Sequence, residues 1–276
     1  MKKFKNGGIG TYIFLIIFTV IQIYPLFWMF CFSLKTNNEI FGDNVAGLPM
    51  FWKWSNYVEA WTNGNVGQYF FNTVVVTLLT VLFTVIFAAM ASYALSRMVW
   101  KLSRTVMTIF LLGLMIPIHC ALLPLFLTYV KLGVLNTYFC LVLPYTAFAL
   151  PLAIYIFTGY MEGIPREMEE SAFIDGCNIF KCFTRIIVPM LKPVIATVTI
   201  VTFLNTWNEF MLASTFITKS SMKTLTVGVQ EMVGQYTTNW GPVGASLVLA
   251  SLPTLVIYIL MSKQVQKSFM AGAVKG

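Results

Sequence analysis

Half of the chain's carboxylates lie close together in one short stretch. Five of the ten Asp and Glu residues of this 276-residue chain fall between positions 162 and 176: Glu162, Glu167, Glu169, Glu170 and Asp175. Buried charge without a partner is costly, so this acidic island needs water or a polar partner. Two interpretations fit it: a surface that docks against another protein, or a solvated loop that holds two apolar segments together.

Residue types that perform covalent chemistry are few and scattered. An intramembrane hydrolase needs a nucleophile beside a base, but Ser92 and Ser103 lack a G-x-S-x-G context and His119 is the only histidine. The five cysteines contain no C-x-x-C pair, and one histidine cannot complete a zinc site with them. The phosphate-binding pattern G-x-x-x-x-G-K-[ST] is absent, so the chain is not expected to hydrolyse ATP. We expect no enzyme, no cofactor and no metal.

The composition predicts a membrane protein that crosses the bilayer several times. The chain is 58% hydrophobic and 10% charged, whereas soluble domains carry roughly 25% charged residues. Six apolar windows are each long enough for the roughly 20 residues that a spanning helix needs: 11–34, 72–96, 105–130, 138–160, 193–217 and 241–261. Strand-like alternation is absent. We therefore expect an all-α fold with six transmembrane helices in one domain over 1–276, with Pro117 and Pro124 kinking the third helix.

The basic residues predict the orientation. Thirteen of the 18 Lys and Arg residues lie on the side that holds both termini. The other five lie on the opposite side: Lys35, Lys53, Lys131, Lys219 and Lys223. The positive-inside rule places the richer side in the cytoplasm, so both termini and the loop 161–192 are expected there. This bias explains the net charge of +8 without a nucleic-acid partner.

The acidic island has the pattern of a helix, a tight turn and a second helix. Pro165 suits a first helical position, and Met168 and Ala172 lie four residues apart, as on one apolar face. Gly176 can adopt the left-handed conformation that ends a helix. Asn178 is a suitable N-cap for the next helix. The pattern predicts a helix pair along the membrane surface.

The fifth window is largely apolar, and Asn205, Asn208 and Glu209 are its only amide and carboxylate side chains. In a continuous helix these residues and Leu212 share one face. Ionisable groups inside a membrane usually face a bundle interior or a water-filled path. The residues either line a translocation path or form interhelical hydrogen bonds that hold this subunit to a partner.

Several segments resemble known transporter sequences. Glu170-Ser171-Ala172, then three residues, Gly176, and later Ile186-x-Val188-Pro189 resemble the signature loop of ATP-binding-cassette importer permeases, with Ser and Val in place of the family's Ala and Leu. The segments 204–210, 224–230 and 272–276 are similar to segments of carbohydrate importer permeases. The last of these resembles the ending of the smaller permease subunit of maltose-type systems.

This resemblance implies a fold and a set of partners. The fold would be that of a type I importer permease in a bacterial-type cell membrane. The partners would be ABC ATPase subunits, a second related permease, an extracytoplasmic sugar-binding protein and membrane lipid. A secondary transporter, the main alternative, would need coupling-ion carboxylates within its spans; only Glu209 qualifies. The transported sugar is not predicted.

The resemblance also assigns roles to particular residues. The coupling loop that docks in the ATPase would contain seven of them: Glu167, Glu169, Glu170, Ser171, Ala172, Asp175 and Gly176. The substrate path would include Asn205, Asn208 and Glu209.

Aromatic residues gather in the outer segment 35–71. Phe51, Trp52, Trp54, Tyr57 and Trp61 all fall there. Such residues commonly anchor a protein at the membrane interface. The family resemblance implies a second interpretation, in which this side contacts the binding protein.

Overall fold

The computed structural model describes residues 9–42, 44–234 and 238–273, the last twelve of these as backbone alone. The described residues form helices and connecting loops without a strand, which confirms the all-α prediction. The chain divides into two compact units, one made of residues 1–67 and 228–252 and the other of residues 68–227 and 253–276. We call these unit 1 and unit 2.

Four helices are long and apolar enough to cross a bilayer without interruption. They are α1 (Ile9–Ser33), α4 (Val66–Ser96), α7 (Phe139–Met161) and the first part of α14 (Trp240–Ala273). Two further spans form if each of two bent helix pairs is counted as one: Ser103–Gly113 with Ile118–Leu132, and Ile179–Met190 with Lys192–Trp207. The described residues therefore hold four to six spans, in agreement with a multi-pass membrane protein.

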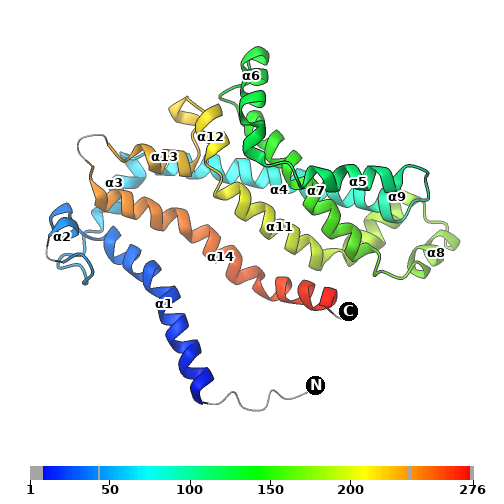
Figure 1. The fold of residues 1–276 in the computed structure, drawn as a ribbon, viewed down its shortest axis with the longest axis horizontal. Helices are drawn as coiled ribbons and strands as arrows, with labels where there is room; N and C mark the ends of the chain where they lie inside the picture. Colours follow the sequence, from blue (N-terminus) through cyan, green and yellow to red (C-terminus); the bar gives the residue numbers. More distant parts are fainter. Residues whose placement is uncertain (1–8, 43, 235–237, 274–276) are drawn as a thin grey trace. The chain divides into compact units, whose positions relative to one another are not determined.

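The third predicted span is broken rather than kinked. It consists of α5 (Ser103–Gly113), the 3-10 turn η1 (Ile118–Ala121) and α6 (Leu122–Leu132), with an 89° bend between its two halves. Figure 1 shows α6 turned away from the line of α5. Pro117 is extended at the break. The helix ends before it because proline lacks an N–H and disfavours helix in the residue before it. Pro124 lies in the first turn of α6, where an N–H is not needed.

The fifth predicted span is also interrupted. It contains α11 (Lys192–Trp207) and α12 (Met211–Phe216), separated by Asn208–Phe210. The expected single helix over 193–217, with one polar face reaching Leu212, is therefore wrong. The hydrogen bonds that cause the break are described with the site below.

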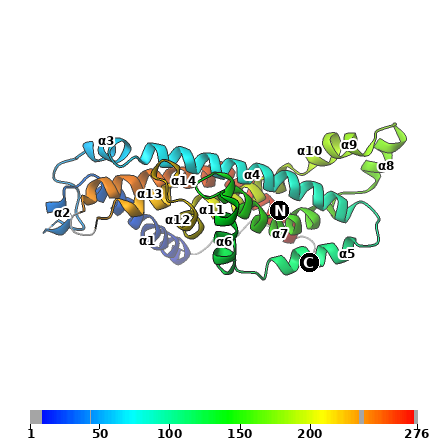
Figure 2. The same cartoon turned by 90° about the horizontal axis from the view of Figure 1, so that it is seen from above.

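The connection between α7 and α11 is itself helical. It contains α8 (Glu167–Ile174), α9 (Ile179–Cys182), the π-helical turn η2 (Phe183–Ile187) and α10 (Val188–Met190). Figure 2 shows α8, α9 and α10 together at one end of unit 2. The acidic island of the sequence lies in this projection.

Unit 2 has two apolar clusters between its long helices. The first joins α4, α7 and α11 through side chains such as Ala88, Phe157 and Val194. The second joins α7 and α12 through side chains such as Leu141 and Phe216, near the short helices η3 (Ser220–Met222) and α13 (Leu225–Glu231). These clusters fix the helices that carry the candidate site.

Unit 1 is held together by close backbone contacts. Besides α1 it contains α2 (Asn37–Phe41), α3 (Ser55–Thr62) and the start of α14. The Asn56 amide donates to the carbonyls of Ser33 and Lys35 at 2.9 and 3.0 Å. A Cβ on Gly244 would lie 2.5 Å from the Phe32 ring, so glycine lets α14 approach the end of α1. Four of the outer aromatic residues, Phe51, Trp52, Trp54 and Trp61, are exposed, and Tyr57 is half-buried; their role stays a prediction.

Candidate functional site

The helix pair α8–α9 has the turn that its sequence predicts. Gly176 has φ +79°, the left-handed region that favours glycine. The N–H of Cys177 donates to the Ala172 carbonyl at 2.9 Å, which closes the end of α8. The Asn178 side chain accepts from the Lys181 N–H at 2.9 Å and caps α9. The helix, the turn and the second helix are confirmed.

The buried face of α8 differs from the predicted one. Glu169 and Ala172 are each 6% exposed, whereas Met168 is 46% exposed. The expected apolar pair of Met168 and Ala172 is therefore wrong. A carboxylate takes the inner position because a cation meets it there.

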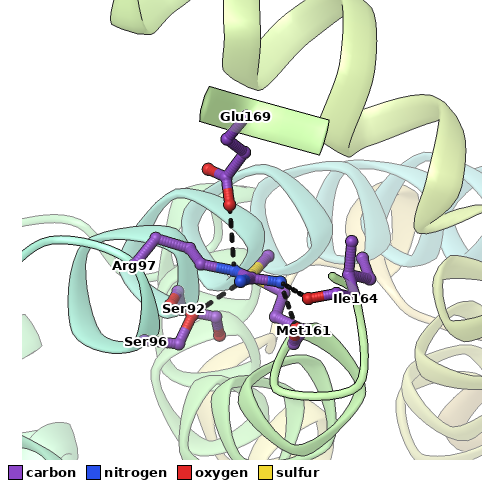
Figure 3. Close-up of polar contacts among 6 residues, drawn as sticks. All are labelled: Ser92, Ser96, Arg97, Met161, Ile164 and Glu169. Atoms are coloured by element: carbon purple, nitrogen blue, oxygen red, sulfur yellow. Dashed lines mark hydrogen bonds and ion pairs between the residues drawn. The ribbon is translucent and has the colours of Figure 1, made fainter. Parts of the chain in front are cut away.

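That cation is Arg97, directly after the end of α4. Its Nε lies 3.3 Å from Glu169 Oε2, and both side chains are less than a tenth exposed, at 6% and 8%. The contact is a charge pair rather than an aligned hydrogen bond, since Nε has no hydrogen-bond acceptor. The guanidinium also donates to the carbonyl of Met161 and, at 2.7 Å, to that of Ile164 (Figure 3). Arg97 thus joins α4, the end of α7 and α8.

Arg97 enters the sequence predictions only as one of the thirteen cytoplasmic cations. A signal was nevertheless present, because an arginine directly follows the apolar run that ends at Ser96. Nothing in the spacing indicated that its partner would be Glu169, 72 positions later in the sequence.

The outward face of the helix pair combines apolar and acidic side chains. Ile174 is 86% exposed, Phe180 76% and Phe173 45%. The island carboxylates Glu167, Glu170 and Asp175 are exposed among them, as is Ser171, whose hydroxyl donates to the Glu167 carbonyl at 2.8 Å. Large apolar side chains exposed together within a polar rim are typical of a contact surface. We call Glu170, Phe173, Ile174, Asp175 and Phe180 the exposed tip.

A pocket of about 270 Å³ lies between α8, α9 and the end of α4. Its lining includes Tyr93, Arg97, Arg166 and Phe173. The buried ion pair therefore lies directly beside a space that a partner's side chain can enter.

The polar residues at the end of α11 take different positions. Asn205 and Asn208 are exposed. Asn205 borders a small cavity of about 50 Å³ between α7 and α11, lined also by Leu152 and Thr202. Asn208 donates to the Leu204 carbonyl of its own helix at 2.8 Å.

Glu209 turns inward and starts α12. Its carboxylate accepts from the backbone N–H groups of Leu212 and Ala213 at 2.8 and 3.1 Å and from the phenol of Tyr145 on α7. A side chain that caps a helix start satisfies N–H groups that have no partner within the helix. Glu209 therefore ends the continuity of α11 and α12 and no longer shares a face with Asn205.

These features define the class of protein: a helical, multi-pass membrane protein with an exposed helix pair at one end of unit 2. Among the described residues, no three His, Cys, Asp or Glu side chains gather where they could hold a metal. The family model described as "Binding-protein-dependent transport system inner membrane component" matches residues 85–270. The chain belongs to this family and is a membrane transport component, as the sequence predicts, rather than an enzyme.

The relatives agree with this assignment over the whole chain. The chain is 36% identical over 275 residues to a probable ABC transporter permease protein, YurM, of Bacillus subtilis, covering all of this chain and 91% of the relative. It is 32% identical over 260 residues to the diacetylchitobiose uptake system permease protein NgcG of Streptomyces coelicolor, covering 94% and 86%.

A solved structure shares the fold. A chain of a bacterial ABC transporter that imports the acidic polysaccharide alginate superposes with a TM-score of 0.82 at 24% identity. The match covers 93% of this chain and 95% of that one. The likeness supports the architecture of an ABC importer permease.

Proposed function

We propose that this chain is a permease subunit of an ATP-driven carbohydrate importer, in which it forms half of the translocation path beside a second permease. Relatives named for uptake of diacetylchitobiose and of starch degradation products support the carbohydrate class. The positive-inside distribution supports cytoplasmic termini. An extracytoplasmic binding protein would deliver the sugar from the other side.

The observation that carries the coupling part of the proposal is the exposure of Ile174 and Phe180 on either side of the Gly176 turn. An apolar tip at the end of a two-helix projection has no partner within the described chain. Contact with an ATPase subunit would remove these side chains from water, at roughly 25 cal/mol for each Å² of apolar surface. Glu167, Glu170, Ser171 and Asp175 would form the polar rim, and the buried Ala172 would hold α8 against its support.

The path part of the proposal rests on α11. Asn205, in α11, and Asn208, directly after its end, are exposed amides in a largely apolar segment, and hydrocarbon penalises such groups. We assign both to the path surface. Glu209 belongs to the same site as the residue that fixes the end of α11.

The transport cycle follows as a two-state switch. ATP binds better to the form in which the two ATPase subunits are closed, and so raises the population of that form. Closure moves the docked helix pairs and turns the path outward to receive sugar. Hydrolysis returns the path to the inward form.

Co-purification tests the coupling part. The affinity-tagged chain should retain the ATPase and the second permease when it is extracted from its native membrane. An Ile174→Asp, Phe180→Asp variant should lose the ATPase and keep the second permease. Val99, which is 95% exposed just after α4, supplies the matched control, and Val99→Asp should keep both. Undiminished ATPase in the double variant would contradict the docking assignment.

A thiol reporter tests the path part. In a chain whose native cysteines are replaced, Asn205→Cys should react with a small cationic methanethiosulfonate faster when the ATPase is trapped with vanadate. A complex whose ATPase lacks its P-loop lysine should show no acceleration. Equal reactivity in trapped and nucleotide-free complexes would contradict path lining.

A further inference from the structure

The ion pair between Arg97 and Glu169 lies where three helix ends meet. Arg97 directly follows α4, and its backbone N–H donates to the Tyr93 carbonyl at 3.0 Å, which continues the hydrogen bonding of that helix. Its side chain reaches the carbonyls of Met161 and Ile164 at and beyond the end of α7. Glu169, in the first turn of α8, closes the contact from the other side (Figure 3).

The chemistry of arginine suits this junction. A guanidinium presents several N–H donors in a rigid plane, so one side chain can serve a carboxylate and two carbonyls together. The carbonyls at a helix C-terminus lack partners within the helix and favour a cation. A lysine has one ammonium on a flexible stem and cannot hold all three elements in fixed geometry.

The contacts around the pair make α4 and α7 a single support. Ser92 donates to the Ile154 carbonyl at 3.0 Å, and Ser96 contacts the Met161 sulfur at 3.5 Å. Ala88 and Ala89 of α4 lie in the same apolar cluster as Ile154 and Phe157 of α7. A force applied to α8 therefore reaches both helices through one buried side chain.

We infer that Arg97 is the positioning residue that transmits displacement of the α8–α9 helix pair to α4 and α7. This inference rests on the proposed function, because it assumes that an ATPase moves the helix pair. Arg97 does not touch nucleotide or sugar in this account. It acts by holding Glu169, so that docking and path opening occur as one event.

The test separates transmission from folding. Removing one partner leaves the other as a buried unpaired charge, which is strongly destabilising. The informative variant is therefore Arg97→Gln with Glu169→Gln, which removes both charges of the pair and leaves no unpaired buried charge. We call it the junction variant. Arg104→Gln with Glu162→Gln makes the same change in charge at two exposed residues, neither of which belongs to the Arg97–Glu169 ion pair.

The readout is the Asn205→Cys reporter in the purified importer complex, together with ATP hydrolysis and retention of the ATPase. In the junction variant the ATPase should stay bound and hydrolyse ATP. The vanadate-dependent rise in thiol reactivity should fall roughly tenfold, which lies within the roughly 5- to 150-fold range of allosteric couplings. The control variant should keep the full rise. Arg97→Lys should retain part of it.

Other outcomes overturn the inference separately from the proposed function. A full rise in the junction variant contradicts transmission through Arg97 while leaving the importer assignment intact. Failure of the junction variant to assemble assigns the pair to folding and also contradicts the inference. If the thiol of Asn205→Cys shows no vanadate-dependent rise in reactivity in a chain that keeps Arg97 and Glu169, the proposed path itself is contradicted.

Discussion

The phenol of Tyr145 on α7 donates to the carboxylate of Glu209, which lies in the break between α11 and α12. The same carboxylate caps α12 through Leu212 and Ala213. One acidic side chain thus sets where α11 ends and holds that end against α7. The exposed Asn205 one turn earlier depends on this arrangement for its position.

Replacement of Glu209 should weaken the fold at this break. Loss of a side-chain cap typically costs 0.5–2 kcal/mol, so Glu209→Ala should lower the free energy of unfolding by about 2 kcal/mol once the Tyr145 hydrogen bond is included. Tyr145→Phe should cost about 1 kcal/mol. Thermal unfolding in detergent measures both. Asn208→Ala is the control, since the Asn208 side chain donates to the Leu204 carbonyl within its own segment; an equal loss there would contradict the assignment.

The sequence predicts the helical class and the α8–α9 turn because both depend on local information. Apolar windows mark the spans, while Gly176 and Asn178 suit the ends of two helices. The prediction that Met168 lies on the buried face of α8 was wrong, because Glu169 takes that face to pair with Arg97, which is far away in the sequence. The break at Asn208–Phe210 also depends on a distant residue. The Glu209 carboxylate is held at the start of α12 by the phenol of Tyr145 on α7, and the local sequence does not indicate that partner.

The turn at Gly176 should be intolerant of branched side chains for a backbone reason alone. A Cβ there would meet nothing within 4 Å, but the left-handed conformation costs roughly 1–2 kcal/mol in a residue other than glycine. Gly176→Leu should leave the chain in the membrane and abolish uptake. Gly176→Asn should retain part of the uptake, because asparagine tolerates this conformation.

Gly133 provides the matched control for that substitution. It ends α6 with φ +65° and is equally open, with nothing within 4 Å of a Cβ. Gly133→Leu carries the same backbone cost away from the helix pair, so the ATPase should remain coupled. Wild-type uptake in Gly176→Leu would show that the turn does not serve docking.

Charge reversal at Glu170 should weaken ATPase binding if the exposed tip docks as proposed. Glu170 is exposed, and we expect a complementary polar or basic group opposite it. Glu170→Lys then replaces attraction by like-charge repulsion, typically several kcal/mol at an interface. The yield of co-purified ATPase measures the effect, with Glu162→Lys as the control. A yield unchanged at both low and high salt would rule out this contact.

The outer segment of unit 1 should respond to acid through Glu39. Burial raises the pKa of Glu39, but N–H donation from Thr36 and Met50, the Thr36 hydroxyl and the nearby Lys35 charge together hold it below the ordinary 4.5. A depressed folded pKa stabilises the fold above pH 4.5, and this contribution disappears as pH falls through the folded value. The charge-removing variant Glu39→Gln should therefore unfold at a lower temperature than the wild type at pH 7.

The same comparison at lower pH completes that test. The difference in unfolding midpoint between the wild type and Glu39→Gln should shrink as pH falls below 4.5 and vanish when the wild-type carboxylate is protonated. A difference that stays constant or grows between pH 7 and that range would contradict the stabilising role of the Glu39 charge.

The most direct test of the central claim is transport by the purified complex in proteoliposomes. The vesicles would hold the tagged chain with its ATPase and second permease, and the binding protein would be added on the side that carries Lys53 and Lys131. Radiolabelled diacetylchitobiose, maltotriose and raffinose would serve as probes. The account predicts accumulation of at least one of these sugars that requires both ATP and the binding protein. Accumulation driven by a proton or sodium gradient without ATP would contradict it.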